Sequence, residues 1–170
     1  MGIDTTFGLA FAKSQLAAGD RLPETGTVFM SLADRDKATG VEAARRFVEA
    51  GFSLAATAGT ADALEAAGIA VATRVAKVGE ATGTDAVALI ASGKVQLVVN
   101  SPRGRGARAD GAHIRAEAAV QSVPCLTTAA AGLAAANGIL DTARHELRVR
   151  TLQEFHRGID LDRPSLPLDG

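Results

Sequence analysis

The stretch from Thr27 to Thr57 reads TVFMSLADRDKATGVEAARRFVEAGFSLAAT, and it decides the fold. It opens with a short apolar run over residues 27–32, which is typical of a strand buried on both faces. An amphipathic helical pattern follows over residues 36–50, and a second short apolar run over residues 53–57. A strand, a helix and a strand at this spacing predict a βαβ unit with parallel strands.

Two local signals refine the helix of this unit. Val41, Ala44 and Val48 recur at helical spacing and are predicted to form its buried face. Gly51 follows the last periodic residue, where a helix commonly ends in a left-handed glycine. The helix is therefore expected to end at about residue 50.

The same alternation continues along the chain, and it predicts an α/β fold with a parallel five-stranded sheet covered by helices on both faces. The result is a three-layer architecture with right-handed crossovers. Beyond the first unit, strands are predicted at 71–78, 95–99 and 124–126, helices at 5–17, 60–67, 85–92, 110–122 and 127–137, and a weaker helical pattern at 141–157.

Composition narrows the class of protein. The 170 residues are 47% hydrophobic and 22% charged, which suits one domain with a substantial core. A net charge of −1 and the absence of Tyr and Trp argue against nucleic acid as a partner. No apolar run reaches the ~20 residues of a membrane span, and the single Cys125 excludes an internal disulfide. We expect a soluble, cytoplasmic domain without a membrane partner.

Three segments are expected along the chain. Residues 1–25 form an N-terminal arm, whose helix either caps the domain or joins it to a preceding one. Residues 26–157 form the domain itself. Residues 158–170, with two prolines and three aspartates, are predicted to be a disordered tail.

Polar side chains follow the end of every predicted strand. Because ligands bind outside the carboxyl ends of strands in open α/β sheets, these side chains are expected to share one site. Hydroxyls, a glycine beside a helix start and two lysines suit a phosphomonoester rather than a metal, and no carboxylate–histidine pairing accompanies them. The set comprises Ser31, Lys37, Thr57, Gly59, Thr60, Lys77, Asn100, Ser101 and Thr127.

Simpler interpretations stand beside this one. Thr57 to Thr60 is also the pattern of a helix N-cap and a tight turn. Lys37 and Lys77 are ordinary as solvated surface lysines. Asn100 suits a strand end that needs its backbone satisfied, and the glycine–arginine loop over 103–108 suits a surface loop without a ligand. The placement of all of them at one edge of the predicted sheet favours a binding site.

An ordered set of segments resembles the C-terminal allosteric domain of the carbamoyl-phosphate synthase large subunit, a member of the methylglyoxal-synthase-like superfamily. The resemblance covers about residues 2–157. Its segments are AFAKSQL (10–16), GTVFMSL (26–32), Asp36-Lys37, LAATAGT (54–60), GKVQLVVN (93–100), GRGARADG (104–111) and VPCLTT (123–128).

The resemblance implies a regulatory domain without catalysis or cofactor of its own. Its effector would be a nucleoside monophosphate such as uridine or inosine monophosphate. The parent would be a glutamine-hydrolysing ligase that uses ATP with Mg or Mn to make carbamoyl phosphate for pyrimidine and arginine synthesis. Partners would then be the synthetase domains of the same parent chain and the glutaminase small subunit.

The resemblance also assigns roles to residues. It matches Ser31, Lys37, Thr57, Gly59, Thr60, Lys77, Asn100 and Ser101 to the effector and phosphate site, and Thr127 to a threonine near the ornithine site. Two departures leave the identity of the effector and the sign of its effect open. Pro102 replaces a hydroxyl of some members, and residues 79–84 differ from the usual loop.

Two enzymes are the alternatives. A free-standing methylglyoxal synthase acting on dihydroxyacetone phosphate needs a carboxylate base beside the phosphate. Asp34 matches one synthase carboxylate, and Glu80 or Asp85 offers another, but Ser101 stands where the synthases carry an aspartate. The cyclohydrolase domain of purine synthesis shares the Thr-x-Gly-Thr loop, but its segment after the third strand is absent.

Overall fold

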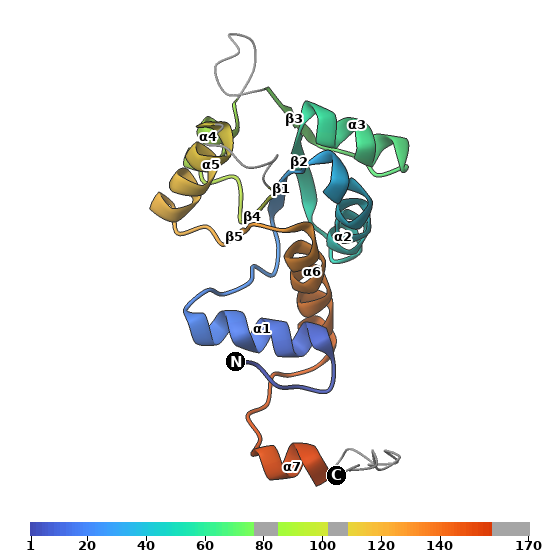
Figure 1. The fold of residues 1–170 in the computed structure, drawn as a ribbon, viewed down its shortest axis with the longest axis vertical. Coiled ribbons are helices and arrows are strands. Elements are labelled where there is room, and N and C mark those ends of the chain that lie inside the picture. Colours follow the sequence, from blue (N-terminus) through green and yellow to red (C-terminus); the bar gives the residue numbers. More distant parts are fainter. Residues whose placement is uncertain (77–84, 102–108, 158–170) are drawn as a thin grey trace, which may run out of the picture.

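The computed structural model describes residues 1–76, 85–101 and 109–157 of the chain. Within these residues a parallel five-stranded sheet has the order β3-β2-β1-β4-β5 and carries helices on both faces, which confirms the predicted class (Figure 1). The strands are β1 (Thr27–Ser31), β2 (Ser53–Thr57), β3 (Thr73–Val75), β4 (Leu97–Asn100) and β5 (Cys125–Leu126).

Helices connect successive strands and cover the sheet from two sides. One apolar core lies between the sheet and α2, α3 and α6, and a second lies between the sheet and α4 and α5. The helical segments are α1 (Phe7–Ala18), η1 (Asp34–Asp36), α2 (Lys37–Glu49), α3 (Ala58–Ala66), α4 (Ala86–Ala91), α5 (Ala109–Val120), α6 (Ala129–Arg144) and α7 (Leu152–Arg157).

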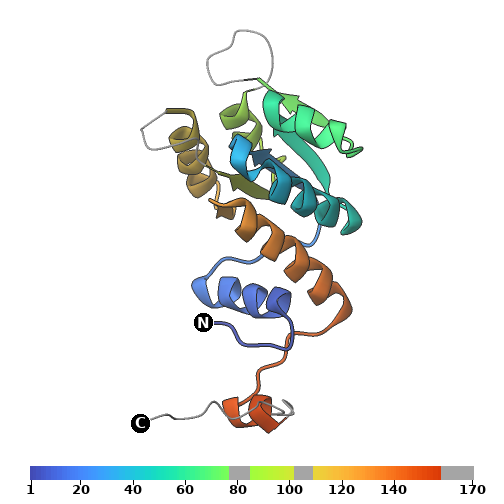
Figure 2. The same ribbon diagram turned by 45° about the vertical axis from the view of Figure 1, so that its right-hand side comes forward.

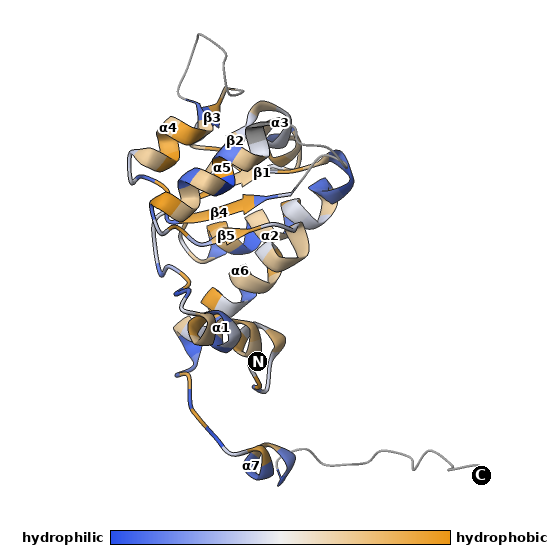
Figure 3. Ribbon diagram, turned by 60° about the vertical axis from the view of Figure 1, so that its left-hand side comes forward, coloured by the Kyte–Doolittle hydropathy of each residue, from blue (hydrophilic) through white to orange (hydrophobic). Residues whose placement is uncertain are grey.

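Strand β1 shows why the central strands read as continuous apolar runs. Val28 and Met30 belong to the first core, whereas Phe29 belongs to the second, and none of the three side chains is exposed. Because successive strand residues point to opposite faces, a strand covered on both faces needs apolar residues at every position. Figure 3 shows the same apolar character along β4.

The buried face of α2 differs from the predicted one. Ala44 is buried as predicted, but Val48 is 47% exposed, and the rest of the buried face consists of Gly40, Ala43 and Phe47. The Phe47 ring packs edge-on against Phe52, with ring centroids 6.0 Å apart. The largest side chain of the helix therefore sets its rotation, and the valine spacing alone does not.

Helix boundaries follow the predicted signals with two corrections. Gly51, Gly68 and Gly93 have positive φ, as expected for glycines that end helices. Helix α3 begins at Ala58, not at Thr60, which places Thr60 in its first turn. The pattern over 141–157 divides between the end of α6, which reaches Arg144, and the separate helix α7.

Helix α1 explains the length of α6, because it packs alongside its second half (Figure 2). Two glycines let the helices approach. A Cβ at Gly8 would lie 2.8 Å from the carbonyl carbon of Asn137, and one at Gly138 would lie 2.8 Å from the Gly8 oxygen. Leu9 of α1 is buried, whereas Phe7 is 73% exposed. The C-terminal segment returns to α1, because Lys13 donates to the Arg148 carbonyl at 2.6 Å.

Among the described residues, no helix has the length and apolar character needed to cross a membrane.

Candidate anion site at the carboxyl ends of the strands

The central feature of the site is the junction between β1 and β4. The chain runs outward from β1 to β2 and β3 on one side, and then returns to place β4 and β5 on the other. In open α/β sheets, ligands bind outside the carboxyl ends of the strands at such a reversal of strand order. Ser31 and Asn100 are register partners at this junction, and the Ser101 N–H donates to the Ser31 carbonyl at 2.9 Å.

The first turn of α3 directly follows the carboxyl end of β2, which neighbours β1 in the sheet. Thr57 is the N-cap of α3, but its side chain accepts no backbone hydrogen bond; its hydroxyl lies 3.1 Å from that of Thr60. The caps of α1, α4 and α6 behave differently, since Thr6, Asp85 and Thr128 each accept from a backbone N–H of the first turn. The alternative of an N-cap at this position is confirmed in place, since Thr57 is the N-cap residue, although its side chain bonds to Thr60 and to no backbone N–H. The first turn of α3 keeps the positive end of its helix dipole without a capping side chain.

The Thr60 hydroxyl is buried and already accepts a hydrogen bond. The Leu32 N–H donates to it at 2.9 Å, and the side chain of Thr60 is fully buried. The Thr57 hydroxyl donates to Thr60 Oγ1 at 3.1 Å, so Thr60 Oγ1 accepts from both the Thr57 hydroxyl and the Leu32 N–H. Thr57 is the partly exposed member of the pair. Its hydroxyl holds Thr60 in the first turn of α3, whose N-terminal N–H groups have no capping side chain.

Ser101 and Asn100 are also buried and also bonded within the protein. The Ala33 N–H donates to the Ser101 hydroxyl at 2.9 Å. The Asn100 side-chain amide donates to the Gly111 carbonyl in the first turn of α5 at 3.1 Å. Together with Thr60, these are the buried polar side chains of the described residues, and all three lie at this edge of the sheet.

Lys37 is a cation that follows β1 at this end of the sheet. It is the first residue of α2, directly after the turn η1, and its side chain is 28% exposed. Its ammonium forms an ion pair of 2.8 Å with Asp34, whose side chain is 87% exposed. The Lys37 ammonium is therefore already paired with Asp34, and a bound anion would interact with the same ammonium as the Asp34 carboxylate.

Of the remaining predicted site residues, Gly59 and Thr127 make no side-chain contact with the residues above that the structure records, and Lys77 lies outside the described residues. Gly59 is partly buried in the first turn of α3. Thr127 is exposed in the link from β5 to α6 and directly precedes the cap residue Thr128. Lys77, like Pro102 and the loop over 79–84, lies outside the described residues.

Sequence reasoning identified the side chains of this edge but missed the backbone that they hold. Leu32 and Ala33 were not predicted as part of the site, yet their N–H groups donate to two of its buried hydroxyls. No local pattern marks them, because both are small or apolar residues at the end of a buried strand.

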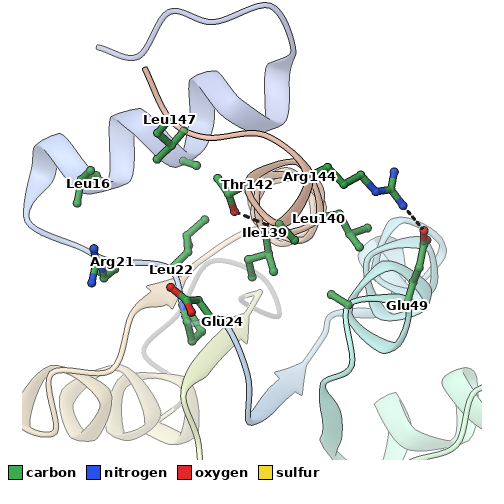
Figure 4. A pocket seen from close by; sticks show the side chains of 14 residues that line it. Leu16, Arg21, Leu22, Glu24, Glu49, Ile139, Leu140, Thr142, Arg144 and Leu147 are labelled. Carbon is green, nitrogen blue, oxygen red and sulfur yellow. Dashed lines mark hydrogen bonds and ion pairs between the residues drawn. The ribbon is translucent and has the colours of Figure 1, made fainter. Parts of the chain in front are cut away.

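A separate groove lies at the amino end of the sheet, where the chain enters β1. It has a volume of about 620 Å³ and runs between α1, residues 21–24 and the ends of α2 and α6 (Figure 4). Leu16, Leu22 and Ile139 give it an apolar lining, and the Arg144–Glu49 ion pair of 3.4 Å crosses its rim. None of the predicted site residues lines it.

A family model described as an MGS-like domain matches residues 39–127, which is more than half of the chain. The chain therefore belongs to the MGS-like domain family. The match includes the α3 turn, Asn100 and Ser101, whereas Ser31 and Lys37 precede it.

Within that family the chain is similar to the large chain of carbamoyl phosphate synthase. It is 50% identical to the one from Rubrobacter xylanophilus over 92% of its own residues and 15% of that protein. The large chain from Streptomyces avermitilis is 47% identical, over 91% of this chain and 14% of that protein. The one from Mycobacterium tuberculosis is 44% identical, over 94% and 15%. The chain thus spans about one seventh of the length of the curated relatives it matches.

Proposed function

We propose that the chain is the effector-binding domain of a carbamoyl phosphate synthase large chain and binds a nucleoside monophosphate at the carboxyl ends of its strands. The observation that carries the proposal is the first turn of α3, which has no capping side chain and stands beside the Thr57–Thr60 hydroxyl pair. A phosphate accepts hydrogen bonds and brings negative charge, both of which a helix N-terminus favours. The similarity to large chains supports the same assignment.

The proposal gives each described residue one task. Thr57 and the first turn of α3 receive the phosphate, and Lys37 supplies the neighbouring charge. Ser31 and Asn100, at the β1–β4 junction, lie on the side that takes the nucleoside. Lys77 joins the phosphate side by resemblance alone. Uridine and inosine monophosphates are the expected effectors, and the isolated chain itself performs no reaction.

The remaining domains of such a large chain require a surface on this one. We place it on α1, where Phe7 is 73% exposed and Leu16 is 52% exposed, and near Thr127. Exposed apolar residues of this size suit contact with another domain. The synthetase domains, the glutaminase small subunit and ATP with Mg or Mn belong to the proposed parent, and the proposed location is cytoplasmic.

The test is a thermal-shift panel with uridine, inosine, adenosine and guanosine monophosphates, and with ornithine. A ligand present at 100 times its Kd stabilises the native state by about 2.7 kcal/mol, which corresponds to roughly 5–10 °C for a chain of this size. We expect a shift with uridine or inosine monophosphate that exceeds the shift with the free nucleoside. No shift with any of the four nucleotides would refute the proposal.

A further inference from the structure

Residues 32 and 33 link β1 to η1 and α2, and their backbone N–H groups donate to two buried hydroxyls that lie on opposite sides of β1. The Leu32 N–H donates to Thr60 Oγ1 and the Ala33 N–H donates to Ser101 Oγ, both at 2.9 Å. Thr60 comes from α3, on the β2 side of β1, whereas Ser101 follows β4 on the other side. Two consecutive backbone donors are thus held by side chains that are distant in sequence.

The two hydroxyls are buried, so water does not readily replace them. Thr60 is 0% exposed and Ser101 is 4% exposed, and Leu32 and Ala33 are also buried. A buried backbone N–H without an acceptor is costly, and each hydroxyl removes that cost for one residue. The position of residues 32 and 33 therefore depends on both side chains.

Residues 32 and 33 lead directly to the ion pair between Asp34 and Lys37. The Asp36 N–H donates to the Ala33 carbonyl at 2.9 Å, which forms the turn η1, and Lys37 then begins α2. Asp34 and Lys37 pair across this turn at 2.8 Å. A displacement of Ala33 must therefore carry the turn, and with it the Lys37 ammonium.

We propose that Ser101 is a positioning residue of the anion site, which acts on a bound phosphate through Ala33 and Lys37 and does not contact it. Thr60 performs the same task from the other side through Leu32. This inference rests on the function proposed above and assigns Ser101 a different role from the direct effector contact that the resemblance implies. The hydroxyl accepts from the backbone of a neighbouring strand end and the side chain is only 4% exposed, whereas the cation that it orients is four residues further along the chain than Ala33.

The test is a double-mutant cycle on the full chain with inorganic phosphate and uridine monophosphate as probes, measured by calorimetry. Ser101→Ala is expected to weaken binding by about tenfold. Lys37→Met weakens it as well, and adding Ser101→Ala to Lys37→Met is expected to change affinity less than twofold, because the residue that Ser101 orients is already gone. Ser101→Thr keeps the hydroxyl and is expected to restore binding to within about threefold of the original chain.

The control is Ser92→Ala, which removes a hydroxyl that donates to the Leu89 carbonyl at the end of α4. It should leave phosphate affinity unchanged. If the fold-losses of affinity of Ser101→Ala and Lys37→Met multiply in the double variant, Ser101 acts independently of Lys37 and the inference is refuted. Unchanged binding in Ser101→Ala would overturn it equally.

Hydrogen exchange at the Ala33 amide separates this inference from the proposed function. Exchange is expected to accelerate at least tenfold in Ser101→Ala, with the amides of β2 unchanged. If the original chain binds neither probe, the proposed function fails and the positioning role fails with it, even if the Ala33 amide is protected. If the original chain binds and the Ala33 amide exchanges equally in both proteins, the positioning role alone fails. Should Ser101→Ala not fold, Thr60→Ser and Thr60→Val provide the same comparison through the Leu32 amide.

Discussion

The ion pair between Lys37 and Asp34 leads to opposite expectations for two single substitutions. Lys37→Met removes the cation beside the proposed phosphate while keeping most of the side-chain volume. A hydrogen bond to a charged group contributes about 1.5–3 kcal/mol. Nucleotide affinity is therefore expected to fall by roughly 10- to 150-fold.

Asp34→Asn should act in the other direction. The carboxylate lies 2.8 Å from the Lys37 ammonium, and a phosphate oxygen on the far side of the same ammonium would lie within about 6 Å of it. Two unit charges at this separation repel by about 0.7 kcal/mol in a water-like dielectric, which applies because Asp34 is 87% exposed. Removing the negative charge is expected to tighten binding about threefold.

Calorimetry with uridine and inosine monophosphates measures both effects, and urea unfolding checks that each variant is folded. Lys94→Met is the matched control, because Lys94 is exposed and precedes β4 at the opposite edge of the sheet. It makes the same change of charge and should leave affinity within twofold. The reasoning is refuted if Lys37→Met binds as well as the original chain, or if Asp34→Asn weakens binding as strongly as Lys37→Met.

The other predictions concern activity, packing, reactivity and autonomy. No methylglyoxal should form from dihydroxyacetone phosphate above the uncatalysed rate; turnover that Asp34→Asn or Asp85→Asn abolishes would instead favour a synthase. Gly8→Ala should lower the free energy of unfolding by about 1–3 kcal/mol in urea titrations, because its Cβ would lie 2.8 Å from the Asn137 carbonyl carbon; an unchanged midpoint would contradict the close packing of α1 on α6. Burial raises the pKa of the Cys125 thiol above its usual range, so less thiolate exists at pH 8, and iodoacetamide should alkylate it more slowly than in the unfolded chain, with rates rising as pH increases. Nucleotide affinity of this chain should lie within a hundredfold of that of the proposed full-length large chain, since the described site comes from its own strand ends; a greater loss in calorimetry would mean that another domain completes the pocket.

Much of the fold was predictable because its signals are local. The apolar runs of β1 and β4 follow from burial on both faces, and Gly51, Gly68 and Gly93 mark helix ends through their backbone conformation. The rotation of α2 was not predictable from the valine spacing, because the contact between Phe47 and Phe52 decides it and Phe52 lies outside the helix. The extension of α6 to Arg144 depends in the same way on α1, a partner more than a hundred residues away.

The sequence by itself determined which kinds of side chain end each strand, and the rule for parallel strands was enough to collect them at one edge. Only the tertiary structure decided what those side chains do. Thr57 has the residue type and position of a helix cap, yet its hydroxyl bonds to Thr60, so the first turn of α3 has no capping side chain. Ser101 was predicted as a ligand contact, a prediction that stays open, and only the structure shows that its hydroxyl accepts from Ala33 of a neighbouring strand end. The reason is physical: a hydroxyl can bond to whichever partner lies within about 3 Å, and that partner is set by how the strands pair, which no residue type specifies alone.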